Sequence, residues 1–222
     1  NTRQNGYDIS ADVLGYPESY YTPNADALEE IRIVRGAASL QYGTQFGGMI
    51  NFRLKKPNPN KNLEFISRNT YGSFDFFNSY NSISGKPGKL SYFGFANYKQ
   101  GSGYRPNSGF SAINTFAHLD YQFSNRTSLN FEMTYLNYLS QQAGGLTDSQ
   151  FEENPKFSNR ERNWFSVDWQ LYSMMLKHKL TYRTNISLNL FGLHARRDAL
   201  GFRGDPRRPE RNPITEPDDS SL

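Results

Sequence analysis

From residue 63 onward, apolar and polar residues alternate along the chain. Successive side chains of a β-strand point to opposite faces of its sheet, so this alternation predicts strands with one apolar face. The first expected strand begins at 63–68. The others are expected at 74–84, 90–100, 115–123, 128–139, 164–182 and 186–197. The sixth segment is long enough for one tall strand or two short ones.

The lengths of the connections alternate as well, if 164–182 is counted as one strand. The links at 85–89, 124–127 and 183–185 are short, whereas those at 101–113, 140–163 and 199 onward are long and polar. The tight turn at Gly72-Ser73 is an exception, because it falls on the side of the long loops. Tight turns at one end and large loops at the other are typical of outer-membrane barrels.

In a barrel, successive residues of a strand face the lipid and the lumen in turn. Six residues are expected to face lipid: Leu129, Phe131, Met133, Ile186, Leu188 and Leu190. Four are expected to face the lumen or whatever fills it: Asn130, Glu132, Ser187 and Asn189. The alternation by itself leaves a β-sandwich or an adhesin repeat open as another interpretation.

The first sixty residues have a different texture. Residues 1–23 are polar and turn-rich, and no regular element is expected there. Asn24 is a candidate N-cap for a short helix over 25–30, followed by a strand from Ile31 and a second strand over 49–54. The run 57–60, Pro-Asn-Pro-Asn, predicts a boundary between two strand-rich regions.

Residues 31–57 carry the most specific pattern in the chain. A β-branched run stops at a glycine, a small-residue turn follows, and a glycine pair precedes the next strand. The residues that define this order are Arg35, Gly36, Tyr42, Gly43, Gly47, Gly48, Ile50 and Asn51. Their types and gaps resemble the C-terminal end of the plug domain of TonB-dependent outer-membrane receptors. One departure is Leu14, which stands where that family's Asp-Gly-x-Pro turn has aspartate.

The resemblance implies an all-β fold in two parts. The C-terminal part of a plug domain would occupy 1–56, a linker 57–61, and the N-terminal part of a transmembrane antiparallel β-barrel 62–222. About seven strands would be present, and the chain would be a fragment of a receptor that has about 22. Arg35 would lie in a polar interface between plug and barrel, beside acidic residues of the inner wall.

The same resemblance implies a function and a location. Receptors of this family import an iron chelate across the outer membrane of Gram-negative bacteria. The energy comes from the TonB protein, which acts through an N-terminal segment absent here. Residues 160–169 are similar to the ferric citrate and iron-chelate branch. The other interpretations are a non-transporting outer-membrane barrel, which serves adhesion or complex assembly, and a soluble β-rich binding domain.

Composition narrows the chemistry. The chain has 222 residues, no cysteine and three scattered histidines, so no disulfide or thiolate metal site is possible and no metal or cofactor is expected. No catalytic motif is present, and an enzyme is not expected. A net charge of +4 without a lysine-rich run argues against a nucleic-acid partner.

The long loops supply the candidate ligand contacts. They are rich in arginine, and the residues predicted to bind ligand are Arg105, Arg160, Arg162 and Arg203. Guanidinium groups bind carboxylates and phosphates through paired hydrogen bonds, which suits an anionic ferric chelate. Loops that face the phosphates of outer-membrane lipopolysaccharide would show the same bias, so both partners stay open.

Overall fold

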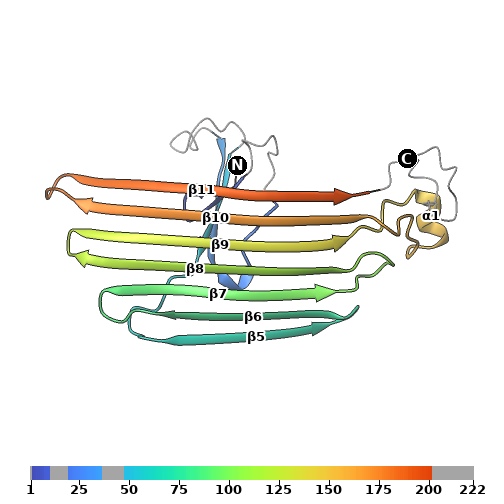
Figure 1. Cartoon of the computed structure of the whole chain (residues 1–222), viewed down its shortest axis with the longest axis horizontal. Coiled ribbons are helices and arrows are strands. Elements are labelled where there is room, and N and C mark those ends of the chain that lie inside the picture. The colour runs from blue at the N-terminus through green and yellow to red at the C-terminus, as the bar shows by residue number, and fades with distance from the viewer. Residues whose placement is uncertain (1, 11–19, 37–47, 202–222) are drawn as a thin grey trace.

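The computed structural model describes residues 2–10, 20–36 and 48–201, which form two sheets (Figure 1). The larger sheet has seven strands that follow one another in chain order, and each neighbouring pair is antiparallel. The strands are β5 (Glu64–Gly72), β6 (Phe76–Gly85), β7 (Leu90–Gly101), β8 (Phe110–Ser124), β9 (Thr127–Gln141), β10 (Trp164–Lys179) and β11 (Asn185–Leu200). The segment at 164–182 is therefore one tall strand.

The expected start of the fourth strand is wrong by five residues. Strand β8 begins at Phe110 rather than at Thr115, because Phe110 pairs with Gly101 on one side and with Ser140 on the other. The backbone ladder thus extends into residues expected to form a loop. The remaining long loop, between β9 and β10, contains the helix α1 (Asp148–Glu153), which the pattern of the sequence did not predict. No helix in the described part of the chain is long and apolar enough to cross a membrane.

The outer face of this sheet has two zones along the strands. The zone nearer the short turns is apolar and exposed, and it contains Leu119, Tyr121, Phe123, Phe131, Met133, Tyr172, Met174, Leu176, Ile186, Leu188 and Leu190. Nearer the long loops the same face is mixed. It carries Asn137, Asp168, Gln170, His194 and Arg196, with Ile113 and Leu139 exposed among them. This division indicates a wall whose lower part meets hydrocarbon and whose upper part rises above it.

The smaller sheet belongs to the expected plug and crosses behind the larger one (Figure 1). Its order is β2 (Tyr7–Asp8), β1 (Thr2–Gln4), β4 (Met49–Leu54) and β3 (Leu28–Val34). The expectation of no regular element in 1–23 is wrong, because an Asn-Gly turn folds β1 and β2 into a hairpin.

Asn24 does cap a helix, since its Oδ1 accepts from Asp26 N at 2.8 Å. The helix is a single 3₁₀ turn, Ala25–Ala27, rather than the expected 25–30. The chain enters β3 at Leu28 because this segment, which holds the β-branched Ile31, Ile33 and Val34, pairs with β4 in an antiparallel ladder.

A charge placed on the apolar zone tests this division. Replacement of Phe131 by arginine should destabilise the membrane-inserted state of a barrel by about 2–4 kcal/mol, as expected near the bilayer centre. Asn137→Arg, on the same strand and face but in the mixed zone, should cost at most about 1 kcal/mol. Unfolding by denaturant in lipid vesicles measures both. Equal costs for the two variants would contradict the division.

Candidate functional site at the interface of plug and wall

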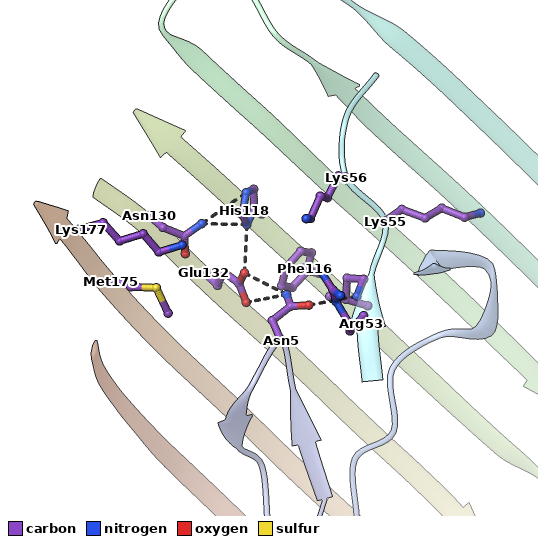
Figure 2. A pocket seen from close by; sticks show the side chains of 11 residues that line it. Asn5, Arg53, Lys55, Lys56, Phe116, His118, Asn130, Glu132, Met175 and Lys177 are labelled. Carbon is purple, nitrogen blue, oxygen red and sulfur yellow. Dashed lines mark hydrogen bonds and ion pairs between the residues drawn. The ribbon is translucent and has the colours of Figure 1, made fainter. Parts of the chain in front are cut away.

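The turn of the β1–β2 hairpin touches the inner wall at one carboxylate. Asn5 and Gly6 have φ angles of 49° and 97°, which are typical of the tight turns that join two strands. Asn5 Nδ2 donates to Glu132 Oε1 at 2.9 Å and to Oε2 at 3.0 Å. Its Oδ1 accepts from Leu54 N at 3.0 Å, so one side chain links β1, β4 and the wall (Figure 2).

Glu132 is 4% exposed and lies on β9. On the wall side, His118 Nδ1 lies 3.0 Å from Glu132 Oε1, where a protonated Nδ1 donates to the carboxylate. The Asn130 amide lies beside the same imidazole, 3.3 Å from Nδ1. A buried carboxylate is costly unless hydrogen bonds replace its water, and Asn5 and His118 supply them. Glu132 therefore belongs inside, as its place in the alternation predicted.

A cavity of about 200 Å³ lies next to Glu132, toward the short turns. Cationic side chains line it: Arg53, Lys55, Lys56 and Lys177 (Figure 2). Two of these are engaged by the plug itself, because Arg53 pairs with Glu30 at 2.9 Å and Lys55 Nζ donates to Asp26 O at 2.6 Å.

A second contact centres on Gln4, which is fully buried. Its Nε2 donates to Thr134 Oγ1 on the wall at 3.1 Å and to the Tyr7 hydroxyl, and its Oε1 accepts from the Tyr21 hydroxyl at 2.8 Å. Burial raises the pKa of Tyr7 well above its usual value, and the charge of Glu132 adds to the effect. Burial also raises the pKa of Tyr21. Both phenols are therefore held neutral as hydrogen-bonding groups.

Apolar packing surrounds these polar contacts. One cluster joins plug and wall through Tyr7, Ile9, Tyr21, Leu136, Val167, Trp169 and Leu171. A second cluster does so through Ala27, Leu54, Tyr80, Phe93, Phe95 and Phe116. Burial of apolar area on both sides of the polar contacts excludes water and fixes the plug sheet against the wall.

On the side of the long loops the interface opens into a cavity of about 430 Å³. Tyr20 and residues 22–26 of the plug form one side, and residues of β6, β7, β8 and β9 form the other. Asparagines from three adjacent strands line the wall side: Asn78, Asn97 and Asn114. This cavity therefore lies on the side of the long loops between β7 and β8 and between β9 and β10.

Part of the glycine-rich motif lies within the described residues. Gly48 has a φ of 93°, and a Cβ there would lie 2.5 Å from Val34 O, so only glycine fits. Gly36 also has a positive φ, 65°, but open space around it. Asn51 Oδ1 accepts from Gly6 N at 3.0 Å, which ties the motif to the hairpin, whereas Ile50 is exposed. Tyr42, Gly43 and Gly47 lie outside the described residues.

The expected burial of Arg35 is not found. Arg35 is exposed, directly after β3. The reason is the strand order, since β3 is the edge of the plug sheet on the side away from the β1–β2 hairpin. Ile31 and Ile33 on the same strand are also exposed, at 53% and 63%.

The loop arginines lie in different settings. Arg105 spans two loops, because Nε donates to Phe157 O at 2.8 Å and Nη1 to Gly144 O at 2.8 Å. Arg160 is 5% exposed, and its Nη1 donates to Asn159 O at 2.8 Å. Arg162 is half-buried in the same loop, and Arg203 lies outside the described residues. Their contact with a ligand stays a prediction.

Sequence reasoning did not find Gln4, Asn5 or the asparagine row as parts of this interface. The Asn5-Gly6 pair is a strong hairpin signal and could have located β1 and β2. The asparagines gave no such signal, because only the strand register places Asn97 opposite Asn114. No group of three or more potential metal-binding side chains gathers within the described ranges.

Comparison with known proteins supports the fold. No family model matches the sequence. The unliganded ferric citrate transporter FecA superposes with a TM-score of 0.73 at 16% identity, over 89% of this chain and 31% of that chain. The pyoverdine outer-membrane receptor FpvA from Pseudomonas aeruginosa PAO1 gives 0.71 at 18% identity, over 90% and 30%. The alcaligin outer-membrane receptor FauA from Bordetella pertussis gives 0.65 at 17%, over 90% and 31%.

The chain thus has the fold of an outer-membrane receptor: part of a plug and seven adjacent strands of the barrel around it. This confirms the all-β, partial-barrel fold predicted from the sequence and its resemblance to TonB-dependent receptors. Two of these three structures are named outer-membrane receptors. The chain spans less than a third of the length of each of these three structures.

Removal of the Asn5 amide should loosen the hairpin from the wall. Asn5→Gly keeps the positive φ and deletes the side chain that binds both Glu132 and the Leu54 amide. A hydrogen bond to a charged group is worth about 1.5–3 kcal/mol, so amide hydrogen exchange over residues 2–8 should accelerate roughly ten- to hundredfold. Asn107→Gly is the matched control, because Asn107 also has a positive φ, 55°, but lies in a loop. Unchanged exchange in Asn5→Gly would show that Glu132 does not hold the hairpin.

The buried tyrosines predict a loss of stability in alkali. The pKa of Tyr7 is raised in the folded state, so its contribution is fully present below the ordinary value of about 10 and is lost as the pH rises above it. The melting temperature of the full-length receptor in detergent should fall above pH 10, and less steeply in Tyr7→Phe. Tyr182→Phe, at a site that is 89% exposed, is the control and should follow the parent chain. Identical profiles for all three would contradict this account.

Proposed function

We propose that this chain is part of a TonB-dependent outer-membrane receptor that imports an iron chelate. The glycine-rich motif, the barrel strands and the superposition with receptors for ferric citrate, pyoverdine and alcaligin support this function. The chelate would enter from the side of the long loops, meet the cavity between plug and wall, and pass to the periplasm when the plug moves. The TonB protein would supply the force that moves the plug.

The observation that carries the proposal is the plug itself, which lies against the inner face of the wall. Two apolar clusters and the contacts of Gln4 and Asn5 hold it there. Because these contacts hold the plug together with the wall, passage of a chelate would require work to move the plug. A barrel that serves only adhesion or assembly has no need of such a gate. The plug therefore favours gated transport over the structural alternative.

The loop arginines have a place in this scheme. Arg105 holds the loop between β7 and β8 against the loop between β9 and β10, so it shapes the entrance. We propose Arg160, Arg162 and Arg203 as contacts for anionic groups of the chelate as it arrives. The boundaries at 1–56, 57–61 and 62–222 are likewise proposals for the division into plug, linker and barrel.

The function is tested by uptake in cells. A strain that lacks its other iron receptors and produces the full-length protein should accumulate radioactive iron from an iron chelate. The same strain without TonB should retain surface binding but lose accumulation, because binding needs only the closed receptor whereas plug movement needs force. Ferric citrate and an uncharged ferric trihydroxamate serve as the two probes.

Two results would count against this function. Accumulation that persists without TonB would indicate an open pore. If neither probe binds or accumulates although the barrel is correctly inserted, a structural role would be favoured.

A further inference from the structure

The cavity on the loop side is lined by uncharged polar groups from three adjacent strands. Asn97 on β7 lies directly opposite Asn114 on β8 in the strand register. Asn97 Nδ2 donates to Asn78 Oδ1 on β6 at 2.8 Å and to Ser79 O at 3.1 Å. These bonds fix a row of amides on the wall, facing the plug segment 20–26.

The last member of the row is unsatisfied. Asn114 is only 8% exposed, and its Oδ1 has no hydrogen-bond partner among the described residues. A buried carbonyl without a partner destabilises the empty receptor, and such groups are rare in folded proteins. An amide in this state, at the edge of a cavity, is suited to receive a group that enters the cavity.

Few ionised side chains line the cavity. Its ionised side chains are Asp26 on the plug and Lys99 on β7. Asp26 is already paired with Arg68 of β5, and Lys99 is exposed. Aromatic rings complete the lining: Tyr20, Phe76 and Tyr138. A multiply charged anion would lose its hydration here against a single cation, the exposed Lys99, whereas an uncharged polar group can replace its lost water with hydrogen bonds to the amides.

We propose that this cavity binds hydroxyl or amide groups of the ferric chelate, with Asn114 as the group that receives them. The inference rests on the proposed import function and names the chemistry of its ligand. A hydroxyl both donates and accepts, so it satisfies the Asn114 amide in either orientation; an amide of the chelate does the same. Aromatic faces beside the asparagine row pack against the carbon skeleton of such a chelate.

Binding to the purified full-length receptor in detergent tests this site. The probes are an uncharged ferric trihydroxamate built on a peptide, which carries free amide groups, and ferric citrate, which is anionic. Asn114→Leu keeps the approximate size of the side chain and removes its polar atoms. It should weaken the trihydroxamate about three- to tenfold per hydrogen bond lost and leave ferric citrate unchanged. Asn189→Leu, an amide on the inner face of β11 outside this cavity, is the control and should change neither affinity.

A second measurement separates a binding role from a structural one. Asn114→Leu should raise the melting temperature of the empty receptor, because an unsatisfied buried amide is replaced by an apolar group. A structural role for Asn114 predicts a lower melting temperature with the trihydroxamate affinity unchanged.

Three other outcomes also test the proposed site. If the parent receptor imports iron with TonB but Asn114→Leu binds the trihydroxamate as tightly as the parent, water fills the cavity and the inference fails while the function stands. Weaker binding of ferric citrate alone would overturn the assignment to uncharged groups. If the parent binds neither probe, the import function fails and this inference falls with it.

Discussion

The structure depends on one constraint, that each strand of the wall meets a different environment on each face. Side chains alternate with a period of two, so a single sequence segment supplies both surfaces. On β9, Phe131 and Met133 point outward while Glu132 and Thr134 point to the plug. A shift of register by one residue would bury phenylalanine against the hairpin and expose the carboxylate to lipid. The position of every plug contact follows from this register.

The contacts between plug and wall combine tight packing with a few polar connections. Apolar clusters supply most of the buried area, whereas Gln4 and Asn5 supply direction through bonds to Thr134 and Glu132. Because these polar groups satisfy one another in the closed state, their separation exposes them and needs water or new partners. In the proposed import function, applied force would open this interface. The cavity with the asparagine row lies on its loop side, where the proposed chelate would arrive first.

Much of the wall could be predicted from the sequence, because the alternation on segments such as 128–139 is a local signal. The number of strands and the faces of Phe131 and Glu132 followed from it. The start of β8 at Phe110 did not, since that end is set by pairing with Gly101 and Ser140. Arg35 was misplaced because its burial depends on the order of strands in the plug sheet. Asn114 could not be recognised as a site residue, since its lack of a partner appears only when three strands and the plug are assembled.

The central claim is that one face of this sheet contacts lipid and the other contacts the plug, and spin labels along β9 test it most directly. Single cysteines from residue 128 to 140 of the full-length receptor in lipid vesicles would each carry a nitroxide. Collision with oxygen should peak at Leu129, Phe131 and Met133 and be low at Glu132 and Thr134. Collision with a water-soluble nickel complex should rise at Asn137, where the outer face becomes polar. An oxygen profile without a period of two, or with maxima at Glu132 and Thr134, would contradict the account.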